Sequence, residues 1–163
     1  MQIKNKIEIG PLAQARIEEF LIYLRDHISD NGQHHTPLFV PISRKDLDLP
    51  KEMAESFRKG QALSIKEMGW RRIFVAENEQ NKIVGHIDLR SLNQAYTRHR
   101  AIIGMGVDRD YRKLGLGSSL METAITWAKE KAKLSYIDLQ VLSENKPAIR
   151  LYEKLGFQRL GEM

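Results

Sequence analysis

The sequence contains no cysteine and no long hydrophobic run. Without cysteine there is no disulfide, no thiolate metal ligand and no thiol nucleophile, and such a composition is compatible with a reducing cytoplasm. No stretch approaches the roughly 18 consecutive apolar residues of a membrane-spanning helix. The N-terminal residues carry charges throughout and lack the apolar segment of a secretory signal. We therefore expect a cytoplasmic protein with no membrane partner.

The composition is that of a globular domain with a small excess of positive charge. The chain has 163 residues, of which 42% are hydrophobic and 29% are charged, and chains of this length usually fold as one domain. The formal net charge is +5, which suits a polyanionic partner, either a nucleic acid or a cofactor with phosphates. No run of five or more basic residues occurs, so we expect no nucleic-acid partner.

The spacing of apolar residues predicts a single α+β domain over residues 1–163. Strands are expected at 3–9, 72–77, 83–89, 98–107 and 136–142. Helices are expected at 17–28, at 51–68 with a distortion near Gly60, at 116–128, and at 148–155 before Gly156. Residues 33–50 hold three of the five prolines and should form a long irregular loop.

A turn with two glycines joins the strand at 98–107 to the helix that follows. Gly115 and Gly117 stand at the start of that helix, where unpaired backbone N–H groups and the helix dipole favour an anion. Arg109, Arg112 and Lys113 precede them and add positive charge. The spacing matches neither a dinucleotide-binding fingerprint nor a P-loop. These residues alone fit a phosphate-binding turn and a merely tight turn with solvated basic residues equally well.

Two sequence blocks together indicate a family. Arg112-x-x-Gly115-x-Gly117 and the segment Asn145 to Phe157 (NKPAIRLYEKLGF) resemble, in this order, two blocks of the GNAT N-acetyltransferase superfamily. The resemblance implies a GNAT-like three-layer α/β/α fold with a central mixed, mostly antiparallel sheet flanked by helices. It also implies an enzyme that moves an acetyl group from acetyl-CoA to a primary amine of a small molecule or protein by direct transfer. Two alternatives stay open: a CoA-responsive binding module without catalysis, and a nucleic-acid-binding protein.

The same resemblance implies roles for individual residues. Tyr152 matches a tyrosine that protonates the departing thiolate, which suits a neutral phenol. Its spacing with Ala148 and Leu155 fits a core aromatic of a short helix equally well. The strand before the turn would hold the pantetheine arm, and the turn would hold the pyrophosphate. The expected cofactor-binding residues are Met105, Val107, Arg112, Lys113, Leu114, Gly115, Leu116, Gly117, Ser118, Asn145, Ala148 and Tyr152.

One departure from the family pattern concerns the general base. Many members carry a glutamate in the strand before the turn, where this chain has Ala101 and Ile102. His99 is our candidate base, because an imidazole titrates near neutral pH. Asp88 and His86, which share a face of the preceding strand, are rivals, and a water chain is a further alternative.

A second departure lies at the C-terminus. The chain ends soon after Phe157, before the two strands that complete the family pattern, so we expect the C-terminal strand to be missing from this sheet. An uncovered sheet edge favours pairing with another chain, and a homodimer is therefore possible. The adjacent His34 and His35 have the wrong spacing for one metal-binding face, so we expect no metal site.

Overall fold

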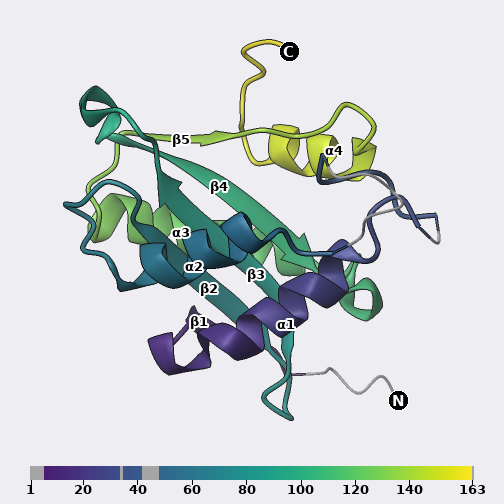
Figure 1. Cartoon of the computed structure of the whole chain (residues 1–163). Coiled ribbons are helices and arrows are strands. Elements are labelled where there is room, and N and C mark those ends of the chain that lie inside the picture. Colours follow the sequence, from purple (N-terminus) through teal and green to yellow (C-terminus); the bar gives the residue numbers. More distant parts are fainter. Residues whose placement is uncertain (1–5, 34, 42–47, 163) are drawn as a thin grey trace.

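The fold is one five-stranded sheet with helices on both faces (Figure 1). The computed structural model describes residues 6–33, 35–41 and 48–162. Strands follow the spatial order β1-β2-β3-β4-β5, with three antiparallel pairs and a parallel β4–β5 pair. In chain order the elements are β1 (Glu8–Pro11), α1 (Ile17–Ile28), α2 (Lys51–Ala62), β2 (Arg71–Glu77), β3 (Ile83–Ser91), β4 (Arg100–Val107), α3 (Leu116–Glu130), β5 (Tyr136–Leu139) and α4 (Lys146–Lys154).

Alternation along the strands builds a separate core on each face of the sheet. Ile73 and Val75 of β2 pack with α1 and α2, whereas Phe74 and Ala76 pack on the face covered by α3. In Figure 1, α1 and α2 lie on the near face and α3 lies behind the sheet. The predicted three-layer fold with a mixed, mostly antiparallel sheet is therefore confirmed.

The second helix is shorter than predicted, and Gly60 does not distort it as expected. Helix α2 ends at Ala62 and runs through Gly60 without a break. Gly60 is buried, and a Cβ added there would lie 2.7 Å from Arg71 Cβ and 2.8 Å from the Gly69 carbonyl oxygen. The glycine thus permits close packing of α2 on the start of β2.

The outer strands also differ from the prediction. Strand β1 extends to Pro11, which pairs with Phe74, and so ends two residues after the predicted end. Residues 3–5 of the expected strand lie outside the described residues. Strand β5 ends at Leu139, three residues before the predicted end at residue 142. It therefore pairs with β4 only from Arg100 to Ile103, and this early end shapes the site.

Candidate functional site

The second half of β4 has a partner on one side only. Residues 104–107 pair with β3, but their pairing with β5 has already ended, and Figure 1 shows the two strands diverging toward α4. The N–H of Asp108 donates to the Val84 carbonyl at 2.9 Å. Because backbone groups alternate in direction along a strand, those of Met105 and Val107 face the opening. The Val107 carbonyl accepts a hydrogen bond from Arg112 Nε at 3.1 Å, whereas the two N–H groups and the Met105 carbonyl are placed to bind an extended polar chain.

The glycine turn places the start of α3 beside this opening. Gly115 has φ +78° and caps α3 with no side-chain hydrogen bond, so the first N–H groups of the helix have no capping partner. Gly117 permits close packing, since a Cβ there would lie 3.1 Å from Leu151 Cδ2 of α4 and 3.5 Å from Met105 Cε. The turn, β4 and α4 therefore meet at one point.

Both arginines of the turn pair with acids near the end of α1. Arg109 Nε lies 2.9 Å from the Asp30 carboxylate, and Arg112 contacts Asp30 at 3.5 Å, Thr36 Oγ1 at 3.2 Å and the Val107 carbonyl at 3.1 Å. The sequence did not indicate these partners. Lys113 is exposed and makes no ion pair within the described part of the chain. The guanidinium groups therefore tie the α1–α2 loop to the turn, and of the predicted basic ligands Lys113 is the one left unpaired.

Three other predicted ligands lie at the turn, and their side chains differ in exposure. Leu116 is buried in the core, so only its backbone can face an anion. Leu114 is 69% exposed, and Ser118 lies in the first turn of α3. The predicted phosphate contacts of this segment are accordingly backbone contacts, with the exception of the Ser118 hydroxyl and the Lys113 ammonium.

Helix α4 brings Asn145 and Tyr152 to the same region. Asn145 caps α4, its side-chain oxygen accepting the N–H of Ala148 at 3.4 Å. Tyr152 packs on the α3-face core, with its ring 5.9 Å from that of Phe157. Burial raises the pKa of the Tyr152 phenol, which stays protonated at neutral pH and can act as a proton donor.

On the opposite face of the sheet, the second half of β4 presents two glycines and no side chain. A Cβ at Gly104 would lie 2.9 Å from Asp88 Oδ1, and one at Gly106 would lie 2.4 Å from His27 Nε2. Asp88 is buried and receives a 3.0 Å hydrogen bond from Arg71 through its other oxygen. Burial raises the pKa of Asp88, and the Arg71 charge opposes that shift. A carboxylate oxygen thus lies over the backbone of β4 where the strands diverge.

His86 lies two residues before Asp88 on the same face of β3 and packs against α1. The Tyr23 hydroxyl lies 2.9 Å from His86 Nδ1 and 3.3 Å from the Gly106 carbonyl oxygen. Burial lowers the pKa of His86 well below its ordinary value, and lowers that of His27 to about 4. Both imidazoles are therefore neutral at pH 7. Tyr23 and His27 were missed from the sequence, because their spacing fits an ordinary amphipathic helix.

The structure does not bring His99 to this site. His99 is exposed and precedes the first residue of β4, with its ring 5.9 Å from that of Tyr136. It lies at the opposite end of β4 from the glycine turn. Of the two rival bases, Asp88 lies over Gly104, where β4 and β5 diverge, whereas His86 packs against Phe20 and Tyr23 of α1.

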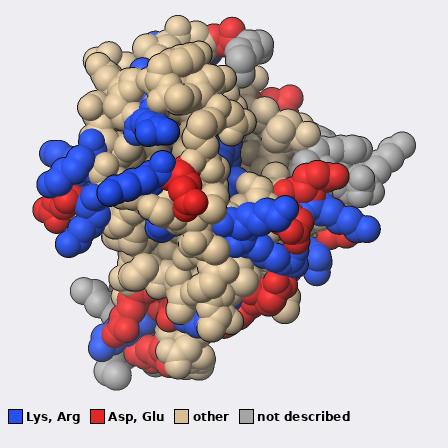
Figure 2. Space-filling view, turned by 60° about the vertical axis from the view of Figure 1, so that its left-hand side comes forward, with Lys and Arg blue, Asp and Glu red and all other residues tan. Residues whose placement is uncertain are grey.

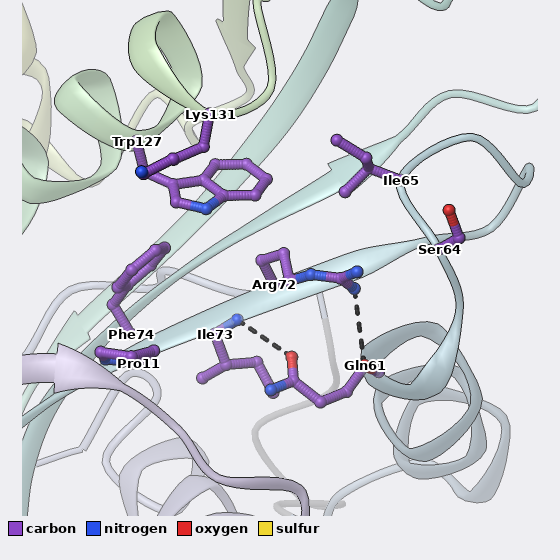
Figure 3. Close-up of a pocket in the computed structure, with 9 residues that line it drawn as sticks. All are labelled: Pro11, Gln61, Ser64, Ile65, Arg72, Ile73, Phe74, Trp127 and Lys131. Carbon is purple, nitrogen blue, oxygen red and sulfur yellow. Dashed lines mark hydrogen bonds between the residues drawn. The ribbon is translucent and has the colours of Figure 1, made fainter.

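The cavity drawn in Figure 3 lies at the other edge of the sheet. It has a volume of about 470 Å³ and lies between the β1–β2 edge, the segment after α2 and the end of α3, with Trp127 and Phe74 among its walls. Gln61 bridges the β2 edge beside it, since it accepts from the Ile73 N–H at 3.2 Å and donates to the Leu12 carbonyl at 2.8 Å. The cavity is separated from the β4–β5 opening by the width of the sheet.

The surface charges are mixed. Figure 2 shows acidic side chains beside the basic clusters on the face it draws, so a polyanion would meet both signs of charge there. No helix among the described residues has the length and apolar character needed to cross a membrane. Within the same residues no three His, Asp or Glu side chains gather as a metal site would require, and His34 lies outside them.

Comparison with known proteins gives consistent matches. The family model described as the acetyltransferase (GNAT) family matches residues 41–157. The catalytic subunit NAA20 of the N-terminal acetyltransferase B complex of Arabidopsis thaliana is 32% identical over 83 residues, which are 51% of this chain and 48% of that protein. The L-amino acid N-acetyltransferase AaaT of Escherichia coli is 32% identical over 76 residues, 47% of either protein. The chain thus spans about half the length of the curated relatives it matches.

Solved structures share the fold over nearly the whole chain. A GNAT-family acetyltransferase from Streptococcus pneumoniae has a TM-score of 0.75 at 26% identity, covering 96% of this chain and 87% of that one. The acetyltransferase yncA from Salmonella typhimurium, described with its cofactor acetyl-CoA, has a TM-score of 0.73 at 17% identity, covering 97% and 83%.

Proposed function

Because the chain belongs to the acetyltransferase (GNAT) family, we propose that it transfers an acetyl group from acetyl-CoA to a primary amine. The observation that carries this proposal is the half-paired end of β4, which opens beside the uncapped start of α3 and the protonated phenol of Tyr152. These three features supply, respectively, hydrogen-bond partners for the donor's amide arm, a pyrophosphate site and a proton donor.

The donor would lie along the turn and the strand. The N–H groups from Gly115 to Ser118 would face the pyrophosphate, with the exposed Lys113 adding charge. Met105 and Val107 would bind the amide groups of the pantetheine arm, as a strand would. Asn145 and Ala148 would border that arm from α4. The same free N–H groups of β4 would polarise the thioester carbonyl oxygen.

The acceptor would approach from the face with the glycines. Helices α3 and α4 occupy the other face, whereas Gly104 is partly exposed and carries no side chain. Asp88, over Gly104, would take a proton from the attacking amine, which must be neutral to react. As the new carbon–nitrogen bond forms and the carbon–sulfur bond breaks, Tyr152 would give its proton to the thiolate.

The test is release of free CoA from acetyl-CoA in the presence of a panel of amines. A thiol reagent reports the reaction without background, because the chain itself has no cysteine. We expect amine-dependent thiol release. Tight binding of acetyl-CoA with no release for any amine would instead favour the alternative of a binding module without catalysis.

The remaining partners are also proposals. The outer edge of β5 has no paired strand within the described part of the chain, and this supports a homodimer through that edge. The face drawn in Figure 2 carries charges of both signs, which favours a small acceptor over a nucleic acid. A titration with duplex DNA at low salt should therefore show no binding. A cytoplasmic location stays a prediction from the sequence. The acceptor is open, since one relative is named for N-terminal acetylation and another for L-amino acids.

A further inference from the structure

Around Gly104, the face of the sheet toward α1 and α2 holds Arg71, Arg90 and Arg100, together with the carboxylates of Asp88 and Asp138. Arg71 is paired with Asp88 at 3.0 Å, and Arg100 is paired with Asp138 at 2.7 Å. Arg90 is the third arginine, and it has no ion pair or hydrogen bond to any residue that the structure describes. Arg90 therefore interacts with Asp88 only at a distance, and no carboxylate of the described residues pairs with its guanidinium directly.

The position of Arg90 follows from the strand register. Arg90 pairs with Arg71 on one side and with Ile102 on the other, and it lies two residues from Asp88 on the same face of β3. Its charge acts on both neighbours, lowering the pKa of Arg71 and of Asp88. Unlike Asp88, Arg90 is partly exposed, so a ligand can reach its guanidinium.

The spacing suits an acceptor with two polar ends. Two residues along a strand span about 7 Å, and neighbouring strands lie about 5 Å apart. An amine placed over Gly104 beside Asp88 therefore has the Arg90 guanidinium within reach of a group a few bonds away. A guanidinium offers a planar pair of donors that matches a carboxylate, and an unpaired, partly desolvated one favours such a partner strongly.

We propose that Arg90 binds a carboxylate of the acceptor, and that the acceptors of this enzyme are amines bearing a carboxylate close to the reacting nitrogen. This rests on the proposed acetyl transfer, because the amine position is taken from that function. The carboxylate has two possible sources, the α-carboxylate of a free amino acid or the acidic side chain of a peptide N-terminus. In both cases Arg90 contacts the substrate and determines specificity without taking part in proton transfer.

The kinetic test compares matched acceptors. Initial rates of thiol release are measured for free amino acids and their carboxamides, and for C-terminally amidated dipeptides with Glu or Gln at the second position. The wild type is expected to prefer the acidic member of a pair by about 10- to 100-fold in kcat/KM, and the pair that shows the preference identifies the source. Arg90→Met should bring the kcat/KM ratio of each acid–amide pair close to 1, and Arg90→Lys should restore part of the preference. The ratio within a pair is the readout, because loss of the Arg90 charge also changes the pKa of Asp88 and with it the rate for every acceptor.

A control variant distinguishes the loss of a positive charge anywhere on the protein from its loss at the acceptor site. Lys82 is exposed in the β2–β3 turn, so Lys82→Met removes one positive charge away from β4 and should leave the preference intact. Equal use of acids and amides by the wild type, or an equal loss for both in Arg90→Met, would overturn the proposal. Because Arg90 makes no ion pair with the described residues, Arg90→Met should melt close to the wild-type temperature.

A binding experiment distinguishes this proposal from the proposed function. Calorimetry in the presence of CoA compares an N-acetylated amino acid with its carboxamide, on the wild type and on Arg90→Met. Selective binding of the acid, lost in Arg90→Met, supports the carboxylate site even where no amine is acetylated, in which case acetyl transfer is the part that fails. Absence of selective binding overturns the carboxylate site even where acetyl transfer is observed.

Discussion

At the scale of single residues, the hydroxyl of Tyr152 has no hydrogen-bond partner among the described residues, and burial keeps it protonated. Tyr152→Phe keeps the packing against Phe157 but removes the proton donor. We expect kcat to fall by on the order of 100-fold with little change in the dissociation constant of acetyl-CoA. Thiol release and calorimetry measure the two quantities.

The matched control for this variant is Tyr96→Phe, in which the same hydroxyl is lost from a side chain that is 79% exposed. It should keep the wild-type kcat. If Tyr152→Phe also turned over at the wild-type rate, the proton would come from elsewhere, and Tyr152 would be a packing residue only.

Asp88 carries a prediction about pH. It accepts a proton only when ionised, and burial raises its pKa, so kcat/KM should decline as pH falls through that raised value. Asp88→Asn should lower the plateau by about 100-fold and remove this acidic limb. Asp48→Asn, at an exposed ion pair with Arg25, is the control and should retain both. A wild-type acidic limb in Asp88→Asn would assign the base to another group.

The Asp88 variant needs a stability measurement beside its kinetics. Removing the charge leaves the buried Arg71 without its counter-ion, which is costly in a protein interior. Urea denaturation at pH 7 therefore accompanies the pH profile, and rates are compared at temperatures where both proteins are folded. A loss of rate that follows the loss of folded protein would not count as a loss of catalysis.

At the scale of elements, the junction between β4 and α3 depends on a backbone conformation. Gly115 has φ +78°, which an alanine adopts at a cost of about 1–2 kcal/mol. Gly115→Ala should therefore shift the first turn of α3 and weaken CoA binding by about tenfold, measured by calorimetry. Gly161→Ala is the control, since Gly161 has open space and no positive φ; unchanged affinity in Gly115→Ala would separate this turn from the phosphates.

The turn after β4 contacts both α1 and α4 around that junction. Arg109 and Arg112 link the turn after β4 to the end of α1 and to the loop that follows it, while Gly117 seats α4 against α3. The ion pairs of Arg109 and Arg112 with Asp30 therefore connect the turn, where the donor would bind, to α1, which covers the acceptor face. The open edge of β4 is then left for the donor, and the face with Gly104 for the acceptor.

At the scale of the whole molecule, two buried histidines make stability depend on pH. The pKa of His27 is about 4 in the folded protein, against 6.5 ordinarily, and that of His86 is also lowered. Between these values the unfolded chain binds more protons, so the free energy of unfolding should fall as pH drops from about 6.5 toward 4. The slope should approach about 1.4 kcal/mol per pH unit for each histidine.

Urea denaturation at pH 7 and pH 5 measures this effect. His27→Phe retains an aromatic ring against Phe39 and should reduce the pH dependence by about half, while the exposed His99→Gln should leave it unchanged. A His27→Phe protein with the full wild-type dependence would show that His27 is protonated equally in both states.

The state of assembly is a second whole-molecule property. If β5 pairs with β5 of a second copy, light scattering should report twice the mass of the chain at high protein concentration. A charged residue on the edge, as in Tyr136→Lys, where the side chain is 56% exposed, should shift the mass toward the monomer. A wild-type monomer at high concentration would rule out this interface.

Local patterns in the sequence determined the elements and the family. Helical spacing predicted α1 from residue 17 to residue 28, as observed, and the two blocks around Gly115 and Tyr152 indicated the GNAT family that the family comparison confirms. These features depend on residues close together in the chain, because turns, caps and amphipathic faces are set by spacing over a few residues. The predicted phosphate-binding turn and the predicted proton donor Tyr152 were both found from such local patterns.

Only the tertiary structure decided which distant groups meet. Arg109 lies 79 residues from Asp30 in the sequence, and the contact of Asp88 with Gly104 depends on the register of β3 against β4. The early end of β5 likewise depends on where its pairing with β4 stops. A charge has several possible partners in a sequence, and the partner it takes is set by which strands and helices pack side by side. The sequence offered Asp88 only as one of several candidate bases, and its position over Gly104, like the absence of an ion pair at Arg90 within the described residues, emerged only from the folded chain.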